Sequence, residues 1–246
     1  MKADPRDQRR LLDLQAIDTA LAQLAHRRRK LPEHAELESL ARELSALEDE
    51  RVRAQVAVED LDRDITRMEK DVDQVRVRKD RDQSRLAAGS GPAREIEALQ
   101  HEMVSLTRRQ GELEDAQLEL MEQREAAQEV LDGIEGRLTQ TREKRAETEQ
   151  RRGGALAEIA QEEQFRVSAR QPLVGDLPAD LIALYDKVRE ASGGLGAALL
   201  AGGRCGGCRL DLSGADRARI RSSPPDELAR CEECRRIMVR TTESGL

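Results

Sequence analysis

The fold of this chain is decided by residues 37–86, which read LESLARELSALEDERVRAQVAVEDLDRDITRMEKDVDQVRVRKDRDQSRL. One register of alternating three- and four-residue steps runs through the whole stretch, and twelve of its fifteen positions are apolar. The fifteen are Leu37, Leu40, Leu44, Leu47, Arg51, Ala54, Val58, Leu61, Ile65, Met68, Val72, Val75, Lys79, Asp82 and Leu86. A 3.5-residue repeat held for about seven heptads is too narrow for the face of a globular-protein helix and is typical of a coiled-coil seam. The stretch is therefore predicted to be one long helix that needs a partner helix.

A second register of the same kind begins after residues 87–92, which read AAGSGP. Its positions are Ile96, Leu99, Met103, Leu106, Gln110, Leu113, Gln117, Leu120, Arg124, Ala127, Leu131, Ile134 and Leu138, continuing less regularly to Ala155 and Ile159. The glycines and the proline between the registers end one helix and suit the start of the next. Because so short a linker cannot return the chain for parallel pairing, we predict an antiparallel hairpin within one chain. The alternative is pairing between subunits, so the protein is expected to be a monomer or a coiled-coil-mediated dimer.

The composition is that of a mainly α-helical protein without a large globular core. Charged residues make up 37% of the 246, and the chain has one Phe, one Tyr and no Trp. The formal charge of −7 is spread over interleaved acids and bases, which gives no strong overall attraction to nucleic acid or to an anionic membrane. The N-terminus has no apolar signal region, and no apolar run reaches the roughly eighteen residues of a membrane span. We expect a cytoplasmic protein with reduced cysteines and no membrane contact.

The outgoing arm of the hairpin is expected to have two parts. A first helix is predicted over residues 5–31, and Pro32 should then break or kink the arm near residues 31–33, because an interior proline costs about 3 kcal/mol. The arm and its return together predict a helical coiled-coil hairpin domain at residues 1–170.

The returning helix is expected to end near Val167, with a bend at Gly153 and Gly154. An irregular linker then leads into a second domain at residues 171–246, which contains a short helix over residues 179–191 and a zinc ribbon. The two aromatic residues, Phe165 and Tyr185, are expected to anchor this small globular end, because a large ring is used first for packing.

All four cysteines lie in the last fifth of the chain, as Cys205-x-x-Cys208 and Cys231-x-x-Cys234 with twenty-two residues between the pairs. This spacing matches a structural zinc site of four thiolates, in which each tight turn brings two sulfurs to one tetrahedral ion at about 2.3 Å. Disulfides, a redox dithiol and free thiols are the alternatives, and neither a secretory signal nor a βαβ pattern supports the first two. Four thiolates leave no open position, and no other catalytic constellation is present, so we predict one structural zinc and no enzyme activity.

The residues around the cysteines predict the remaining parts of the ribbon. Ser213 followed by Asp216 indicates the capped start of a short helix that ends near Arg221, and residues 237–239 read as a strand. Residues 204–240 hold nine arginines and six acids, which gives a net charge of +3. Zinc with four thiolates contributes −2, so the net charge of the ribbon is about +1. This footprint is weak for nucleic acid, and residues 204–240 offer no aromatic ring for base stacking.

Two groups of basic residues are candidates for binding a partner. Those on the ribbon are Arg217, Arg219, Arg235 and Arg236, and those at the tip of the hairpin are Lys79, Arg81 and Arg85.

The coiled-coil hairpin, Glu95-Ile-Glu-Ala-Leu-Gln-His-Glu102 after the turn, Leu184-Tyr185, and Cys205-Gly-Gly-Cys208 before Cys231-x-x-Cys234-Arg-Arg-Ile237 together resemble the bacterial C4-type zinc-ribbon family with a long helical hairpin. The resemblance covers essentially the whole chain, and the Arg-, Ala- and Gly-rich composition resembles an actinobacterial member. It implies a non-enzymatic adaptor whose partners include an alternative sigma factor, flagellar export components or RNA. The family commonly has Pro and Gly where this chain has Glu232 and Arg235. A left-handed backbone at Arg235 would cost about 1 kcal/mol.

Two other functions remain open from the sequence. One is a factor that reaches into RNA polymerase, because such proteins combine a coiled-coil hairpin with a zinc finger and acidic tip residues, for which Asp80 and Asp82 are the candidates. The other is a direct RNA- or DNA-binding protein.

Overall fold

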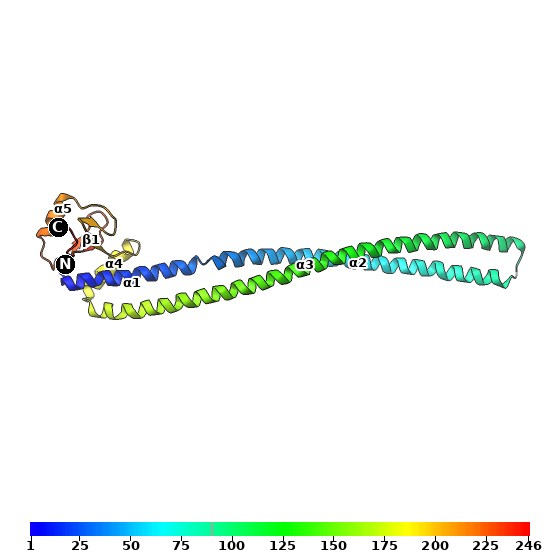
Figure 1. The fold of residues 1–246 in the computed structure, drawn as a ribbon, viewed down its shortest axis with the longest axis horizontal. Helices are drawn as coiled ribbons and strands as arrows, with labels where there is room; N and C mark the ends of the chain where they lie inside the picture. Colours follow the sequence, from blue (N-terminus) through cyan, green and yellow to red (C-terminus); the bar gives the residue numbers. More distant parts are fainter. Residues whose placement is uncertain (90) are drawn as a thin grey trace. The chain divides into compact units, whose positions relative to one another are not determined.

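The computed structural model describes residues 1–89 and 91–246, and most of the chain is helical (Figure 1). The elements in chain order are α1 (Pro5–Arg29), α2 (Pro32–Ala88), α3 (Ala93–Asp176), α4 (Ala179–Ala191), β1 (Ala197–Ala201), β2 (Arg204–Cys205), α5 (Gly214–Ser222), β3 (Ala229–Arg230) and β4 (Ile237–Val239). A long helical hairpin followed by a small C-terminal zinc ribbon was predicted, and the structure confirms it. The short helix predicted over residues 179–191 and the strand over residues 237–239 are α4 and β4.

The chain forms two compact units. The hairpin unit is Ala35–Glu149, and the ribbon unit combines Met1–His34 with Gln150–Leu246. This division differs from the expected boundary between residues 170 and 171. The physical reason is that α1 packs on β1 and β4 and shares a core with them, so the start of the chain belongs to the ribbon end.

Within the hairpin unit, α2 and α3 lie side by side and antiparallel, since over the length of the hairpin the residue numbers of paired side chains rise along α2 and fall along α3 (Figure 1). Four such pairs are Thr148–Glu36 at 3.0 Å, Arg142–Glu48 at 2.9 Å, Arg124–Asp62 at 3.0 Å and Lys79–Gln110 at 3.1 Å. All the predicted seam positions are buried or half-buried, and Leu44, Leu47, Ile134 and Leu138 form a core cluster. The turn predicted at residues 87–92 includes Ser90, which lies outside the described residues; α2 ends at Ala88 and α3 begins at Ala93.

Between α1 and α2 the helical hydrogen bonding stops at Lys30 and Leu31. The Lys30 N–H closes α1 on the carbonyls of His26 and Arg27, and Pro32 is the first residue of α2. At that position the missing proline N–H removes no intrahelical hydrogen bond. Leu31 is buried with Leu24 and Ile159, so the break is covered by apolar packing.

The expectation that the returning helix ends near Val167 is wrong, because α3 stays helical through Gly153 and Gly154 and continues to Asp176. Pro172 lies inside it, at the cost of one backbone hydrogen bond. The helix persists because Leu173 and Val174 pack against the core of the ribbon unit, which offsets a poor local propensity.

The core of the ribbon unit is built from α1, α4, β1 and β4. Its buried members are Ala3, Leu11, Leu14, Leu177, Leu181, Tyr185, Ala197 and Ile237. Tyr185 is an anchor as expected, but Phe165 is not: its side chain is 67% exposed on α3.

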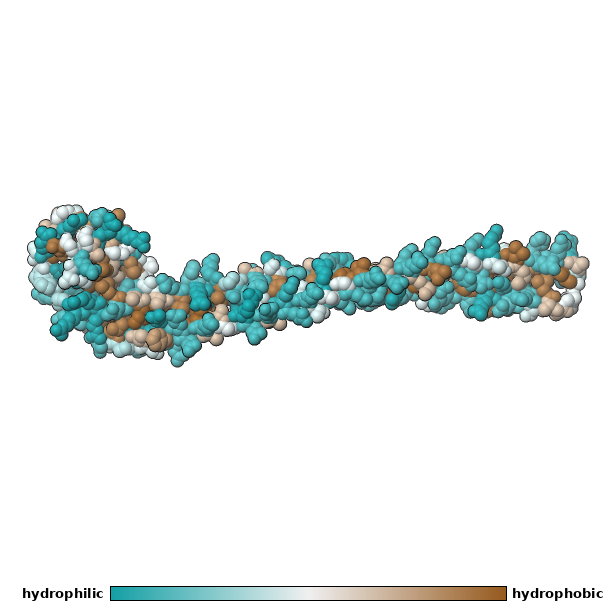
Figure 2. Space-filling view, viewed as in Figure 1, coloured by the Kyte–Doolittle hydropathy of each residue, from teal (hydrophilic) through white to brown (hydrophobic). Residues whose placement is uncertain are grey.

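Four short strands form one sheet in the order β2-β1-β4-β3. β1 pairs in parallel with β4, and the two outer pairings are antiparallel. The start of the chain joins this region as well, because Lys2 bridges to Glu227 and the Ala3 N–H donates to the Asp226 carbonyl at 2.7 Å. The space-filling view shows hydrophilic residues over most of the visible surface of both units (Figure 2). None of the described helices is long and apolar enough to cross a membrane.

Candidate metal centre

The two cysteine turns have the same backbone design. In each turn the N–H of the residue after the second cysteine donates to the carbonyl of the first, from Arg209 to Cys205 at 2.7 Å and from Arg235 to Cys231 at 2.9 Å. Closing so tight a turn requires a left-handed residue, and Arg209 and Arg235 have φ of 62° and 61°. The left-handed backbone considered for Arg235 is therefore present. Arg209 was not foreseen, although both pairs share the pattern Cys-x-x-Cys-Arg.

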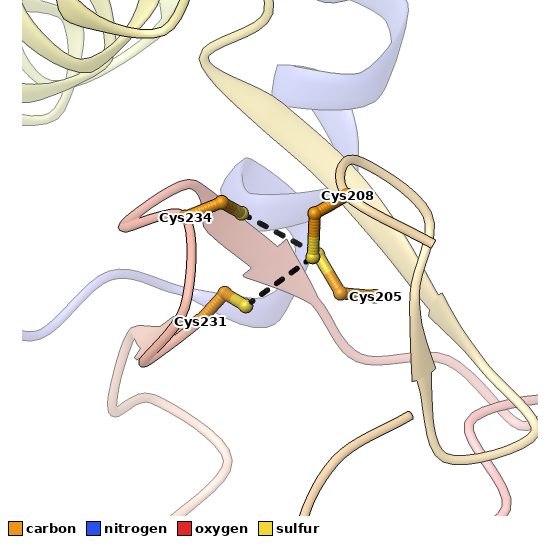
Figure 3. Close-up of side chains that lie close together, drawn as sticks. All are labelled: Cys205, Cys208, Cys231 and Cys234. Atoms are coloured by element: carbon orange, nitrogen blue, oxygen red, sulfur yellow. Dashed lines mark hydrogen bonds between the residues drawn. The ribbon is translucent and has the colours of Figure 1, made fainter. Parts of the chain in front are cut away.

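The four sulfurs converge on one point (Figure 3). All lie within 4.8 Å of one another, with Cys205 Sγ 3.9 Å from Cys234 Sγ and Cys208 Sγ 3.8 Å from Cys231 Sγ. A tetrahedral zinc with Zn–S bonds of about 2.3 Å sets its sulfurs about 3.8 Å apart. The geometry thus fits zinc, and among the described residues this is the one His, Cys, Asp or Glu cluster able to hold a metal.

The ribbon core positions the first cysteine of each pair. Cys205 and Cys231 are buried in a cluster with Leu200, Ile220 and Met238. Ile220 comes from α5, whose start was predicted: the Ser213 hydroxyl caps the helix by accepting the Asp216 N–H at 3.0 Å. The sequence-predicted cap therefore supports a side chain that packs beside the metal site.

The thiols differ in pKa without a metal. Burial raises the pKa of Cys231 to about 12 and also raises that of Cys205. Burial acts in the same direction on Cys234, but hydrogen bonds from the backbone and side chain of Arg236 and from the neighbouring cysteines outweigh it and lower its pKa to about 7. Because zinc binds thiolates, loading the site must release protons.

The four ribbon arginines proposed as a partner-binding surface differ in their contacts and exposure. Arg219 pairs with Asp216 at 3.0 Å and Glu232 at 2.9 Å, and Arg236 donates to backbone carbonyls. Arg217 is half-buried over Gly203. Arg235 is exposed, so the structure does not gather the four into one open basic face.

The candidates at the hairpin tip lie in the hairpin unit. Lys79 faces the seam, where its Nζ donates to Gln110 Oε1. Arg81 and Arg85 are exposed one helical turn apart, beside a groove of about 530 Å³. Asp82 lines the same groove and is only 5% exposed.

The ribbon unit contains a buried polar network that no sequence pattern predicts. Asp18 of α1 is 1% exposed and accepts from Arg170 Nε at 2.8 Å and from the Tyr185 hydroxyl at 2.8 Å. Gln15 Oε1 accepts the Gly196 N–H at 2.6 Å. Burial and the hydrogen bond to Asp18 raise the pKa of Tyr185 far above its ordinary value, so the phenol remains a donor.

This combination of a helical hairpin and a four-cysteine ribbon defines a class of coiled-coil zinc-ribbon proteins. Residues 14–193 match the family model of the CT398-like coiled coil hairpin domain, and residues 204–238 match that of the C4-type zinc ribbon domain. The chain belongs to the CT398-like coiled-coil hairpin family. Its cofactor is one structural zinc ion, and the two domains fit a non-enzymatic structural or binding protein.

Relatives extend along the full length of the chain. An uncharacterized protein of Mycobacterium tuberculosis is 40% identical over 240 residues, which are 98% of each chain. A solved structure from Mycobacterium smegmatis has 36% identity and a TM-score of 0.84 over 98% of this chain and 100% of that one. The structure of CT398 from Chlamydia trachomatis shares the fold, with 19% identity and a TM-score of 0.65 over 95% of this chain and 97% of its own. The mycobacterial relatives agree with the expected actinobacterial character.

Proposed function

We propose that this protein is a cytoplasmic, non-enzymatic adaptor that binds a protein partner at the tip groove of its hairpin unit and displays its zinc ribbon as a second surface. Cys205, Cys208, Cys231 and Cys234 are the zinc ligands in this proposal. Four thiolates fill a tetrahedral ion and leave no position for water or substrate, so the metal maintains the ribbon fold and does no chemistry. The family resemblance implies a partner in transcription, such as an alternative sigma factor.

The groove beside Arg81 and Arg85 is the observation that carries this proposal. Neither guanidinium has a hydrogen bond or ion pair with any described residue, whereas Arg78 on the same helix pairs with Glu102. Asp82 Oδ2 is buried and has no hydrogen-bond partner among the described residues. A buried carboxylate oxygen without a donor costs free energy, so a ligand that supplies a donor there would gain a favourable hydrogen bond.

The charges of the groove indicate the chemistry of the partner. Arg81 and Arg85 are four residues apart, so they match two carboxylates one turn apart on a partner helix. A Lys or Arg of the same partner would supply the donor that Asp82 lacks. We therefore infer that the partner presents an acidic helical face that also carries a basic residue.

A nucleic-acid partner is the first alternative. The ribbon is a less suitable surface for nucleic acid, because several of its arginines have other partners. Arg204 and Arg219 pair with acids, while Arg236 and Arg240 donate to backbone carbonyls. Guanidiniums engaged in this way are not free for phosphates, and phosphate contacts dominate such affinity.

An RNA-polymerase factor that uses acidic tip residues is the second alternative. This function requires exposed acidic side chains that project from the hairpin tip and can reach a catalytic centre. Asp80 is exposed, but Asp82 occupies a seam position and is buried. A single exposed acid supports this function less well than the groove supports an adaptor.

The proposal is tested by capture from nuclease-treated lysate with the tagged full-length protein and two variants. Arg81→Glu with Arg85→Glu should abolish capture of the specific partner. Arg53→Glu with Lys70→Glu changes the charge of α2 by the same amount at exposed positions outside the groove and should leave capture intact. Equal capture by both variants would contradict the groove as the binding surface.

A parallel titration with RNA and DNA separates the nucleic-acid alternative. Phosphate-driven binding through six or more contacts would fall about a thousandfold between about 50 and 200 mM salt. Submicromolar affinity at physiological salt, lost on charge reversal of Arg217 and Arg219 while protein capture stays empty, would replace the adaptor with a nucleic-acid-binding function.

A further inference from the structure

Arg236 connects the second cysteine turn to the end of α4. Its backbone carbonyl accepts the Cys231 N–H at 3.0 Å. Its guanidinium donates from Nε to the Leu195 carbonyl at 3.0 Å and from Nη2 to the Ser192 carbonyl at 2.8 Å. Ser192 is the C-cap of α4, where carbonyl groups lack intrahelical donors. The side chain is half-buried, so these hydrogen bonds are partly shielded from water.

The same side chain also crosses the first cysteine turn. A Cβ atom added to Gly207 would lie 2.5 Å from Arg236 Cδ, well inside any permitted contact. The aliphatic part of Arg236 therefore rests on the backbone of Gly207, between Cys205 and Cys208. One residue thus contacts both cysteine turns and the segment that precedes β1.

We propose that Arg236 is a positioning residue of the zinc centre, which holds the second cysteine turn in place relative to the first and anchors both turns to residues 192–195. Two physical effects favour this role. Zinc with four thiolates carries a net charge of −2, so a half-buried guanidinium beside it is stabilising. Groups that orient metal ligands from outside the coordination sphere typically change metal affinity by about 10- to 100-fold when they are removed. Gly207 is required at its position because any side chain there would displace Arg236.

The test compares Arg236→Gln with Arg235→Gln in the zinc-loaded full-length protein. Both variants remove one positive charge next to Cys234, but Arg235 is exposed, and the described residues show no hydrogen bond from its side chain. Zinc release to excess chelator should be about tenfold faster or more for Arg236→Gln and within about twofold of wild type for Arg235→Gln. Equal release by Arg236→Gln and wild type, or equal acceleration by both variants, would overturn the proposal.

Cobalt substitution distinguishes positioning of the ligands from general stability. A residue that only anchors residues 192–195 would leave the visible spectrum of Co²⁺-loaded, folded protein unchanged on mutation. A positioning residue should shift those bands in Arg236→Gln, and Gly207→Ala should give the same shift by displacing the arginine. Arg236→Lys, which keeps the charge and some donors, should recover part of the wild-type zinc retention. An unshifted spectrum in both Arg236→Gln and Gly207→Ala would contradict the assignment.

Discussion

Two residues of the zinc ribbon have a strained backbone because they close the turns that carry the zinc ligands. Arg209 and Arg235 adopt left-handed conformations that glycine adopts without steric strain. The strain persists because the turns must bring four sulfurs within 4.8 Å of one another. The free energy of zinc binding, about 10 kcal/mol or more for structural sites, exceeds this cost many times.

Replacing Arg235 by glycine should therefore stabilise the ribbon. We expect the free energy of unfolding to rise by up to about 1 kcal/mol, since the steric cost of a left-handed Arg is removed. Thermal unfolding of the zinc-loaded protein measures this change. Arg230→Gly is the matched control: its φ is not positive and it lies in β3, so it should destabilise by about 0.5–1 kcal/mol. Destabilisation by both variants would contradict a strained Arg235.

Loss of one cysteine should unfold the ribbon locally. Cys208→Ser and Cys231→Ser remove a thiolate from the site, and a domain this small depends on its metal for stability. Metal analysis should give less than one tightly held zinc per chain, and hydrogen exchange should rise in β1–β4 while α2 stays protected. Ala201→Ser, at an exposed position at the end of β1, should retain full zinc. A wild-type zinc content in both cysteine variants would refute the ligand assignment.

The buried carboxylate of Asp18 gives a third prediction at this scale. Asp18→Ala removes the ion-pair partner of Arg189 and leaves Arg170 with only its longer 3.6 Å contact to Asp186. Breaking a fully buried pair costs about 3–5 kcal/mol, and the two arginines are partly exposed, so we expect a loss of about 2 kcal/mol. Hydrogen exchange in α4 and β1 measures it, with exposed Asp13→Ala as the control. No difference between the variants would show that the network does not stabilise the unit.

At the scale of elements, the two heptad registers predicted the seam because each register position depends only on local spacing. The helix end at residue 176 could not be predicted in this way. Gly153, Gly154 and Pro172 favour a break locally, and the contacts of Leu173 and Val174 that oppose it come from elements distant in sequence. The Gln15–Asp18 network was missed for the same reason, since polar residues on α1 read as solvated until α4 and β1 cover them. The four cysteines were found because the metal imposes their spacing.

The hairpin should close within one chain. Leu86→Cys with Ile96→Cys places two thiols at seam positions on either side of the turn, so mild oxidation should give an intramolecular disulfide. Non-reducing electrophoresis and peptide mapping identify it, and Leu86→Cys with Val130→Cys, whose second site lies far along α3, should not crosslink within the chain. Disulfides found only between chains would indicate a swapped dimer.

At the scale of the whole molecule, a coiled-coil hairpin and a zinc ribbon fit a structural or binding protein. The hairpin unit has a narrow seam and a largely charged surface, with one groove that combines unpaired arginines and a buried acid. The ribbon unit uses its metal for structure and buries apolar residues in three clusters. Under the proposed adaptor function, the groove near Arg85 is where we expect the partner to bind.

Site-specific photocrosslinking in growing cells tests this claim most directly. A photoreactive residue placed at position 85 should crosslink to one discrete protein after nuclease treatment, whereas the same residue at position 53 on α2 should not. Adding Arg81→Glu should remove the crosslink from position 85, because it removes a charge that recognises the partner's acidic face. Equal protein crosslinks from positions 85 and 53, or crosslinks from position 85 to nucleic acid alone, would contradict the adaptor function.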